Sequence, residues 1–337
     1  MKERVSLAPF TTFGVGGEAR IFIEARTEEE IQEAITYARE CNLQLYPLGA
    51  GSNLLVPDAG VDGVVLKIML DDIAFENDGD DTLIIADAGA RWEKIVDTAS
   101  EHELFGIENL AGIPGTIGGA SVQNIGAYGA ELANTFEYAD CINKTTGAHK
   151  RITRTEAAFA YRTSFFKTHR EFIITRVTLR LSKHATPNIT YPDLARVYEA
   201  GTPLRTPSEI IIAVRAIRAK KFPLSIEEGT AGSFFKNPVI SRELADSLAL
   251  RFPDLPLFPQ EDGSVKISLA WLLDYALSLK GFSINKVRLY EKQPLIIVAR
   301  TGATATEVSA FADEIAKRVF AATGIVIERE VETFGAK

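Results

Sequence analysis

The glycine-rich stretch GIENLAGIPGTIGGASVQNIGAYGA, residues 106–130, decides how the fold is predicted. It holds seven glycines and shows no helical period, yet apolar side chains stand between its glycines. An irregular segment of this length inside a compact domain is usually functional or disordered, and the apolar residues argue against disorder. We therefore interpret it as a loop whose glycines let the backbone approach a flat ligand closely.

A second glycine turn, GAGSN at residues 49–53, follows the strand that we expect at residues 43–49. It lacks the third glycine and the following helix of the dinucleotide-binding fingerprint, and no GK[ST] of a P-loop occurs. Its successive backbone N–H groups can still cradle a pyrophosphate, although a simple turn is the alternative. Two glycine-rich segments on one α/β domain suit a large ligand with a pyrophosphate and a ring system, such as FAD.

Alternating helix and strand patterns surround these two segments. Thr27 followed by three glutamates predicts a helix start, because acids favour the positive end of the helix dipole. The apolar stripe of that helix is Ile31, Ala34, Ile35 and Ala38. Further strands are expected at residues 63–68, 82–89 and 172–182, and helices around Trp92 and from Ser208 to about Lys220. Residues 221–232 are interpreted as a linker.

The sequence after this linker predicts a separate small α/β unit. Helices are expected at about residues 241–252 and 268–280, a strand at 294–300 and a longer helix at about 305–322. The final segment, residues 325–332, alternates between two faces and predicts a strand. One face would carry Ile325, Ile327 and Val331, and the other Val326, Glu328, Glu330 and Glu332.

The composition restricts the class of protein. The 337 residues carry a formal net charge of −8, which disfavours nucleic acid or an anionic membrane as the main partner. No apolar leader segment and no apolar run of about 18 residues occurs, so we expect a cytoplasmic protein. Cys41 and Cys141 stand 100 positions apart without a Cys/His cluster, so neither disulfides nor a metal site is expected. His102, His149, His169 and His184 match no recognised role.

The stretch AGSFFKNP, residues 231–238, sets a hydroxyl, an ammonium and an amide around two adjacent aromatic rings. One interpretation is a surface strand whose phenylalanines face opposite ways, with one of them buried. The other is a site at which Ser233 meets a reacting atom. The stretch by itself leaves both interpretations open.

Six segments resemble, in this order, the UDP-N-acetylenolpyruvoylglucosamine reductase family. They are LGAGSNLLV, ENLAGIPGTIGGASVQNIGAYGAE, FAYRTSFFK, ITYPDL, GTAGSFFKNP and IEREV, and the resemblance covers about residues 11–334. It implies the flavin-dependent reductase of bacterial peptidoglycan precursor synthesis, which uses NADPH and noncovalent FAD. ITYPDL resembles the tyrosine loop of the longer of the family's two types. Thr11 departs slightly from the family, in which Asn is commoner at this position.

The resemblance also implies the fold: α+β and α/β domains, with a two-part FAD-binding domain of the vanillyl-alcohol-oxidase type. Residues 1–67 would form its first subdomain, and residues 68–222, completed by residues 323–337, its second. Residues 223–322 would form a small C-terminal α/β substrate-binding domain. A monomer is expected.

The implied reaction passes a hydride from NADPH through the flavin to the β-carbon of an enolpyruvyl ether. The α-carbon then becomes electron-rich, so it needs stabilising groups nearby and a proton from one face. The resemblance implies that Ser233 donates this proton. It also implies that the two phenylalanines after Ser233 line the site and exclude water from it. It places Arg162 at the substrate carboxylate and Glu328 at the developing charge. A surface arginine and a solvated acid are the alternatives for the latter two.

The remaining binding residues are also implied by the resemblance. Candidates for the UDP-sugar substrate are Tyr128, Tyr191, Lys221, Asn237, Lys280 and Gln293. Candidates for FAD are Gly49, Ala50, Gly51, Ser52, Asn53, Leu54, Ile113, Pro114, Gly115, Val122, Asn124, Gly126 and Arg218. Lys221 has an alternative interpretation, as a cation that favours the C-terminal end of its helix.

Two other functions are alternatives to the reductase. An FAD-dependent alcohol oxidase or dehydrogenase on the same fold is disfavoured by GSFFKNP and by the lack of a histidine in residues 49–53, where relatives often carry a covalent flavin link. A non-catalytic flavin or UDP-sugar sensor is disfavoured because it needs none of Ser233, Arg162 and Glu328.

Overall fold

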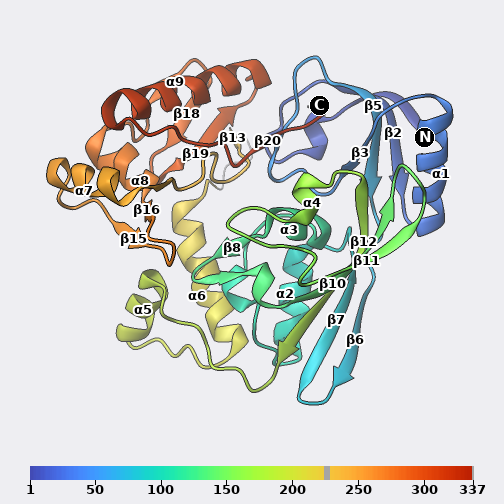
Figure 1. The fold of residues 1–337 in the computed structure, drawn as a ribbon, viewed down its shortest axis with the longest axis horizontal. Coiled ribbons are helices and arrows are strands. Elements are labelled where there is room, and N and C mark those ends of the chain that lie inside the picture. Colours follow the sequence, from blue (N-terminus) through green and yellow to red (C-terminus); the bar gives the residue numbers. More distant parts are fainter. Residues whose placement is uncertain (224–227, 336–337) are drawn as a thin grey trace. The chain divides into compact units, whose positions relative to one another are not determined.

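The computed structural model describes residues 1–223 and 228–335, and the chain divides into two compact units. Unit 1 consists of Met1–Val5, Ala19–Gly51 and Asp62–Lys220, and unit 2 of Ser6–Glu18, Ser52–Val61 and Lys221–Lys337. Part of the expected linker, residues 224–227, lies outside the described residues. The chain is a mixture of helices and strands in both units, as the sequence predicts (Figure 1).

Unit 1 contains two main sheets. The first has the order β1-β2-β5-β3, with bounds Lys2–Ser6, Glu18–Ala25, Val61–Ile68 and Leu45–Leu48. The second is antiparallel in the order β11-β10-β12-β7-β6, with bounds His149–Thr153, Phe136–Asn143, Phe172–Ser182, Asp81–Asp87 and Ile73–Asp78. A small hairpin joins β8 (Gly126–Ala127) to β9 (Ala130–Glu131). The strands predicted at 43–49, 63–68, 82–89 and 172–182 are confirmed within a few residues.

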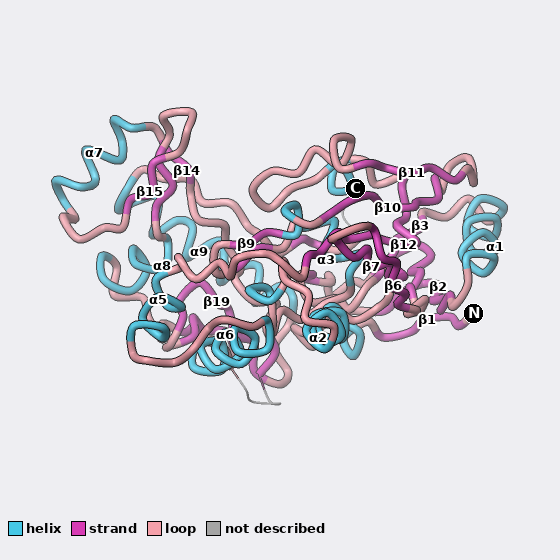
Figure 2. The backbone as a smooth tube through the Cα atoms, turned by 90° about the horizontal axis from the view of Figure 1, so that it is seen from below, coloured by secondary structure: helices cyan, strands magenta, loops and turns pink. Residues whose placement is uncertain are grey.

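The helices of unit 1 flank these sheets. They are α1 (Glu28–Glu40), α2 (Trp92–Glu101), α3 (Ile117–Gln123), α4 (Phe165–Thr168), α5 (Pro192–Glu199) and α6 (Pro207–Lys221), with short 3₁₀ turns at Glu108–Leu110 and Leu132–Asn134. Figures 1 and 2 both show α1 alongside the first sheet. Its predicted start is confirmed, because the Thr27 side chain accepts a hydrogen bond from the Glu30 N–H at 3.2 Å.

Two predictions for unit 1 are wrong in one respect each, although the helix expected from Ser208 to about Lys220 is confirmed as α6. The stretch 106–130 is not wholly irregular: α3 lies inside it, and Thr116 caps this helix. A seven-residue helix that contains two glycines gives too few apolar positions to show a helical period. Ser208 does not cap α6; Thr206 does, because its hydroxyl accepts from the Glu209 N–H while the Glu209 carboxylate accepts from the Thr206 N–H. Pro207 then takes the first helical position, where it needs no N–H.

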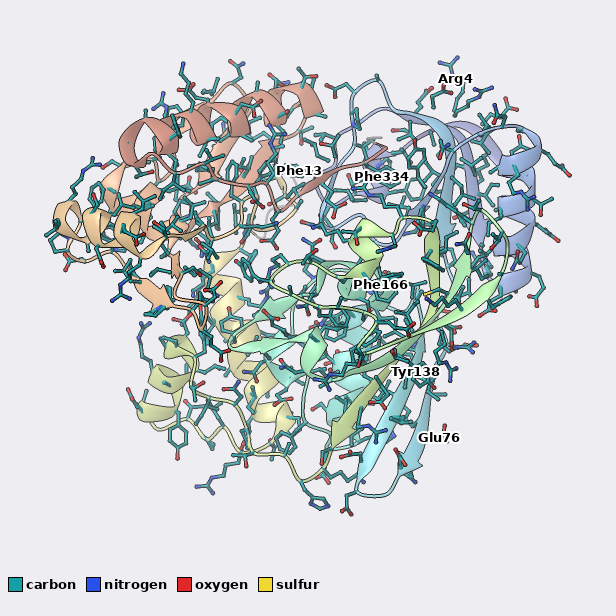
Figure 3. The ribbon with its side chains drawn as sticks, viewed as in Figure 1. Arg4, Phe13, Glu76, Tyr138, Phe166 and Phe334 are labelled. Atoms are coloured by element: carbon teal, nitrogen blue, oxygen red, sulfur yellow. The ribbon has the colours of Figure 1, made fainter. Side chains whose placement is uncertain are left out.

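The core of unit 1 is continuous from α1 to α6. Trp92 is fully buried in it, and its indole N–H donates to the carbonyl of Leu110 at 2.9 Å. Phe166, labelled in Figure 3, packs against the buried Phe136 with 6.2 Å between ring centroids. Arg215 of α6 binds Asp97 of α2 at 2.7 Å and also pairs with Glu93, so an ionic contact reinforces the apolar packing between the two helices.

Unit 2 is built on an antiparallel sheet in the order β13-β19-β18-β17, with bounds Glu228–Gly229, Gln293–Arg300, Val287–Tyr290 and Ser283–Ile284. A smaller sheet has the order β14-β16-β15, with bounds Val239–Ile240, Val265–Ile267 and Leu257–Pro259. The parallel pair β4 (Leu54–Leu55) and β20 (Glu332–Thr333) completes the unit. Figure 1 shows α9 (Ala305–Thr323) running along the β18–β19 sheet.

Of the three helices predicted for unit 2, two are confirmed and one is shorter than expected. The helix at 241–252 is confirmed as α7 (Arg242–Arg251), capped by Ser241, and that at 305–322 as α9. The capping box of α9 pairs Thr304 with Glu307, and Gly324 ends the helix in the left-handed region. The helix expected at 268–280 is shorter: α8 (Leu269–Trp271) continues into a π-helical turn, Leu272–Ala276.

The terminal segment is extended but is not the continuous strand predicted for residues 325–332. Its alternation does hold for burial, since Ile325, Ile327 and Val331 are buried and Val326 is exposed. Only Glu332 belongs to a strand, β20, and Arg329 forms an isolated antiparallel bridge with Phe235. The backbone hydrogen bonds that join the two segments include those from the Lys236 N–H to the Glu328 carbonyl and from the Glu330 N–H to the Phe234 carbonyl.

No helix in the part of the chain that the structure describes is both long and apolar enough to cross a bilayer. Over the same residues, no group of three or more His, Cys, Asp or Glu side chains is arranged to hold a metal ion.

Candidate active site

The two glycine-rich segments of unit 1 meet at Gly49. A Cβ atom added to Gly49 would lie 2.7 Å from Oγ1 of Thr116, so only glycine allows this approach. Close to this contact, the backbone N–H groups of Ala50, Gly51 and Gly115 donate to no acceptor among residues 1–223 and 228–335. Unpaired N–H groups on adjoining turns attract an anion such as a phosphate. The donor set therefore fits the pyrophosphate of a dinucleotide cofactor.

The rest of the second glycine segment is fixed by polar contacts. The Gly112 N–H donates to the Glu93 carboxylate at 2.7 Å, and Nε of Arg218 donates to the Gly112 carbonyl at 3.0 Å. Burial lowers the pKa of the Arg218 guanidinium, which also contacts the Tyr128 hydroxyl. Burial raises the pKa of Tyr128 to about 12, so this phenol is protonated at neutral pH. Arg218 and Tyr128, candidates for FAD and for substrate, thus lie together.

Asn124 is the most heavily bonded of the expected FAD residues. It is fully buried and sits in the left-handed region, with φ of 46°, at the end of α3. Its Nδ2 donates to Glu131 Oε2 at 2.9 Å and to the Ala160 carbonyl at 3.0 Å, and its Oδ1 accepts from the Ala133 N–H at 3.0 Å. All of these partners belong to the protein, so the side chain organises the loop around it.

Arg162 lies against the same loop. Its Nη2 donates to the Gly126 carbonyl at 2.6 Å and its Nη1 to the Asn124 carbonyl at 3.4 Å. A Cβ atom on Gly126 would come within 2.8 Å of Nη1, so the glycine makes room for the guanidinium. Ser164, two residues on, donates to the Val122 carbonyl at 2.7 Å. The segment around Arg162 is thus tied to residues 122–126, and Arg162 is no loose surface arginine.

The segment that carries Tyr191 is tied to this loop as well. Nδ2 of Asn188 donates to the Gly129 carbonyl at 2.9 Å, and Nδ2 of Asn109 donates to both Asn188 and Tyr128 carbonyls, at 2.8 and 2.7 Å. The Tyr191 ring meets the Tyr128 ring edge-on, with centroids 5.2 Å apart. Unit 1 therefore gathers Arg162, Tyr128 and Tyr191 around one loop.

Ser233 belongs to unit 2 and lies on a backbone that β19 fixes. It follows Gly232, whose φ of 76° turns the chain, and it forms an antiparallel bridge with Ile296. The next N–H, that of Phe234, donates to the Leu295 carbonyl at 2.8 Å. The Ser233 side chain is half-buried, and its hydroxyl has no hydrogen-bond partner within the described residues. A held backbone with an unengaged hydroxyl is the arrangement that a proton donor needs.

The two phenylalanines after Ser233 are both core residues. Each is 1% exposed, so the interpretation of a surface strand with one buried ring is wrong. Phe234 packs edge-on against Phe13 at 6.2 Å and against Phe235 at 5.2 Å. Because Phe234 and Phe235 directly follow Ser233, their burial helps to anchor the backbone of Ser233.

Glu328 lies on the segment next to AGSFFKNP. Its side chain is 71% exposed, and its carboxylate accepts a hydrogen bond from Nζ of Lys236 at 2.9 Å. The same two residues are also joined through the backbone, where the Lys236 N–H donates to the Glu328 carbonyl at 3.0 Å. The sequence indicates the ammonium of Lys236 but not its pairing with Glu328, because no local pattern reveals a contact across 92 positions.

The other unit 2 candidates have varied surroundings. Oδ1 of Asn237 accepts from the Leu269 N–H at 3.1 Å, at the start of α8. Oε1 of Gln293 is buried without a hydrogen-bond partner in the described part of the chain, so its acceptor is available to a donor from outside the protein. Lys280 pairs with Asp274 at 2.8 Å. Nδ2 of Asn53 donates to the Glu330 carbonyl at 3.0 Å.

The expected residues therefore fall into two groups. Unit 1 holds Arg162, Tyr128, Tyr191 and Arg218 together with most of the expected FAD residues, including Pro114. Unit 2 holds Ser233 and Glu328 with the remaining candidates, which are Ser52, Asn53, Leu54, Lys221, Asn237, Lys280 and Gln293.

Comparisons with known proteins match a different family model to each of the two parts of the chain. Residues 19–153 match a family model described as an FAD binding domain. Residues 224–334 match one described as the C-terminal domain of UDP-N-acetylenolpyruvoylglucosamine reductase.

Full-length relatives extend the match to the whole chain. The UDP-N-acetylenolpyruvoylglucosamine reductase of Pseudomonas aeruginosa is 37% identical, covering 98% of both chains. That of Escherichia coli O157:H7 is 36% identical over 98% of this chain and 96% of its own. That of Burkholderia cenocepacia is 39% identical over 96% and 94%. The crystal structure of the reductase from Thermus caldophilus superposes with a TM-score of 0.69 at 26% identity, covering 98% of both chains.

These matches confirm the predicted fold class, an FAD-binding domain of the vanillyl-alcohol-oxidase type followed by the C-terminal domain of the reductase. The unpaired N–H groups beside Gly49 are consistent with the flavin-binding part of that match. The chain belongs to the UDP-N-acetylenolpyruvoylglucosamine reductase family and is an FAD-binding oxidoreductase of peptidoglycan precursor synthesis.

Proposed function

We propose that Ser233, Arg162 and Glu328 carry the reduction of the enolpyruvyl ether of UDP-N-acetylglucosamine-enolpyruvate to UDP-N-acetylmuramate, with NADPH as the reductant. The observation that carries the proposal is the half-buried Ser233 hydroxyl, which sits on a fixed backbone and has no partner within the described residues. A half-buried hydroxyl that makes no bond to the described protein atoms is available to a ligand.

Noncovalent FAD is the cofactor in this proposal. The N–H groups of Ala50, Gly51 and Gly115 would hold its pyrophosphate, with Ile113, Pro114 and Val122 beside them and Arg218 and Asn124 shaping the loop. Bound FAD supplies the hydride that the β-carbon receives. Residues 49–53 contain no histidine to which a flavin could be covalently attached.

Ser233 would give its proton to the α-carbon. A hydroxyl is a weak acid in water, but a carbon with carbanion character is a much stronger base, so a positioned serine suffices. Phe234 and Phe235, both buried, would help to keep the serine backbone in place, together with the hydrogen bond from the Phe234 N–H to the Leu295 carbonyl. The proton would then reach the carbon from one face only.

Arg162 and Glu328 would stabilise the charge that develops on the substrate. The guanidinium of Arg162 is oriented by the Gly126 and Asn124 carbonyls before any substrate arrives. A preorganised cation stabilises a developing enediolate more than a mobile one, because no reorganisation is needed during the reaction. Glu328 would polarise the same intermediate as a tightly paired acid, with Lys236 as its cationic partner, because an unpaired carboxylate would repel an enediolate.

The UDP-sugar would be held by the remaining polar candidates. Tyr191 and Lys221 are proposed for the pyrophosphate, and Gln293, whose Oε1 has no protein partner in the described residues, for a substrate donor. Asn237, Lys280 and Tyr128 are further proposed contacts. Residues 189–194 are proposed as the tyrosine loop of the longer family type on their sequence, ITYPDL, and Asn188 ties the residue before them to Gly129.

Several properties stay predictions. They are a cytoplasmic location, a monomeric state, a preference for small-molecule partners over nucleic acid or membrane, and a domain division at residues 1–67, 68–222 with 323–337, and 223–322.

The test separates the two half-reactions. Purified protein is mixed without oxygen with NADPH, and bleaching of the flavin absorbance is followed; the enolpyruvyl sugar is then added and recovery is followed. Ser233→Ala should leave bleaching intact and slow recovery at least ~100-fold, the scale of one lost catalytic group. The matched control Ser283→Ala, at an exposed position of β17, should change neither step.

Other outcomes point to other functions. Equal slowing of both steps by Ser233→Ala would make Ser233 a structural residue. Bleaching by an alcohol, with no recovery on adding the enolpyruvyl sugar, would identify an alcohol oxidase. A protein that is neither bleached nor reoxidised would be a sensor.

A further inference from the structure

Lys236 stands directly opposite Glu328 on two antiparallel segments. The bridge between Phe235 and Arg329 sets the register, and the Lys236 N–H donates to the Glu328 carbonyl at 3.0 Å. Directly opposed residues on antiparallel segments point to the same face. The side chains accordingly meet, with 2.9 Å between Nζ and Oε2.

The backbone at Glu328 is held much more firmly than its side chain. The next residue, Arg329, is anchored to α9 through Ser309 at 3.0 Å and through Asp313. The residue after that, Glu330, donates its N–H to the Phe234 carbonyl at 2.8 Å. The Glu328 carboxylate, by contrast, has Lys236 as its one partner within residues 1–223 and 228–335.

The partners differ in burial. The Lys236 side chain is 23% exposed and that of Glu328 is 71% exposed. A lysine whose stem is packed has few rotamers, whereas a glutamate extending into solvent has many. An ion pair this exposed on one side adds little to folding stability. Its effect is therefore to select one orientation of the Glu328 carboxylate.

We propose that Lys236 is a positioning residue for the reduction: it holds the Glu328 carboxylate in one orientation on the segment next to Ser233. The proposal rests on the role proposed for Glu328. Lys236 need not touch the substrate, because its ammonium acts through the carboxylate. The compact, multi-donor ammonium suits a single monodentate contact of this kind.

The experiment is a double-mutant cycle on the anaerobic recovery step. Lys236→Met, Glu328→Gln and the double variant are reduced with NADPH and mixed with the enolpyruvyl sugar. Lys236→Met should leave bleaching unchanged and slow recovery about tenfold at saturating sugar, an effect on the rate and not on the sugar concentration required. In the Glu328→Gln background the same change should slow recovery no further, because the carboxylate it orients is gone.

Two controls keep the test sharp. Lys236→Arg retains a cation opposite Glu328 and should recover to within about threefold of the wild type. Lys317→Met, at an exposed position of α9, removes an equal charge away from the pair and should change neither step. Circular dichroism of every variant checks that it is folded.

The possible failures are distinguishable. If Glu328→Gln slows recovery but Lys236→Met does not, or if Lys236→Met slows it equally in both backgrounds, the positioning role is wrong and the role of Glu328 stands. If Glu328→Gln leaves recovery unchanged, the role proposed for Glu328 fails, and the role of Lys236 fails with it.

Discussion

Arg162 of unit 1 and Ser233 of unit 2 are both held in place, but different forces hold them. Arg162 depends on a polar network, in which Asn124 and the Gly126 carbonyl supply the contacts. Ser233 lies on a backbone that β19 fixes through the bridge to Ile296, and the two phenylalanines that follow it are buried in an apolar core. The guanidinium of Arg162 is thus held directly by hydrogen bonds, whereas Ser233 is held through its backbone and the packing of its neighbours.

The difference has a physical consequence for substitution. Hydrogen bonds inside a protein need particular donors and acceptors, and one lost partner leaves the others unsatisfied. Apolar cores tolerate changes that conserve volume and fail when a large side chain is truncated. Conservative changes should therefore damage the loop around Arg162 more than the core beneath Ser233, whereas truncation should damage the core most.

The largest effect is expected from truncating the core beneath Ser233. Phe234→Ala removes a ring that is 1% exposed and should lower the free energy of unfolding by ~3–5 kcal/mol, as measured by urea denaturation. The control Phe258→Ala, at a ring that is 48% exposed, should lower it by less than about 1 kcal/mol. Similar losses for both variants would mean that the core does not hold the Ser233 segment.

The second effect concerns the polar network of unit 1. Asn124→Ala removes three side-chain hydrogen bonds at a fully buried position with positive φ, and should lower the free energy of unfolding by about 3 kcal/mol. Asn77→Ala, at an exposed position of β6, is the matched control and should cost less than about 0.5 kcal/mol. If Asn124→Ala lowers the free energy of unfolding no more than Asn77→Ala does, the three hydrogen bonds of Asn124 do not stabilise the loop.

A third, smaller effect tests the room that Gly126 leaves for Arg162. Gly126→Ala would place a Cβ atom 2.8 Å from Nη1, and the displaced guanidinium should slow anaerobic recovery by about tenfold. In an Arg162→Met background the same change should slow recovery less, because the nearest contact is gone while those to Glu131 Cγ at 3.0 Å and to the Ala130 carbonyl at 3.1 Å remain. Equal slowing in both backgrounds would show that the glycine serves another purpose.

The smallest effect concerns a polar clamp in unit 2, at Asp58. Its carboxylate accepts from the Ala305 and Thr306 N–H groups, both at 2.8 Å, and from the Thr306 hydroxyl at 2.6 Å. Partial burial acts to raise the pKa of Asp58, but the hydrogen bonds from Thr306 and Ala305 outweigh it, so the pKa is lowered on folding. Asp58→Ala should therefore lower the free energy of unfolding by about 1 kcal/mol at pH 7.

The pH dependence of that loss follows from the direction of the shift. A carboxyl group with a lowered pKa in the folded state stabilises the fold above its unfolded value, near pH 4, and the stabilisation disappears as the pH falls through the folded value. The difference between wild type and Asp58→Ala should therefore shrink between pH 4 and lower pH, as followed by thermal unfolding. A difference that is the same at pH 7 and in acid would contradict the clamp.

Elements with a strong local signal could be predicted from the sequence. Helix α1 has a capping threonine, three acids and a clear apolar stripe, and β12 is a long run of β-branched and apolar residues. Helix α3 could not be predicted, because its glycines hide the helical period. The Thr206 cap could have been predicted from the sequence, since a proline such as Pro207 favours the first position of a helix.

The candidate site was less predictable than the fold. The Ser233 and Arg162 segments carry distinctive motifs, so they could be identified as functional from the sequence. The partners of these residues could not, because Lys236 and Glu328 are 92 positions apart and meet only through the fold. The bonding of Asn124 was equally hidden, because its partners Glu131 and Ala160 follow no local pattern.

The path of the chain between the two units restricts where the protein can be truncated. The chain passes between the units after residues 5, 18, 51, 61 and 220, so segments from the N-terminal region belong to unit 2. Phe13, labelled in Figure 3, packs on Phe234, and the Thr230 N–H donates to the Thr12 carbonyl at 3.0 Å. A truncation product that starts at residue 221 would lose these contacts and uncover the aromatic core. Transplanting the reductase C-terminal domain into another flavoprotein therefore requires residues 6–18 and 52–61 to travel with it.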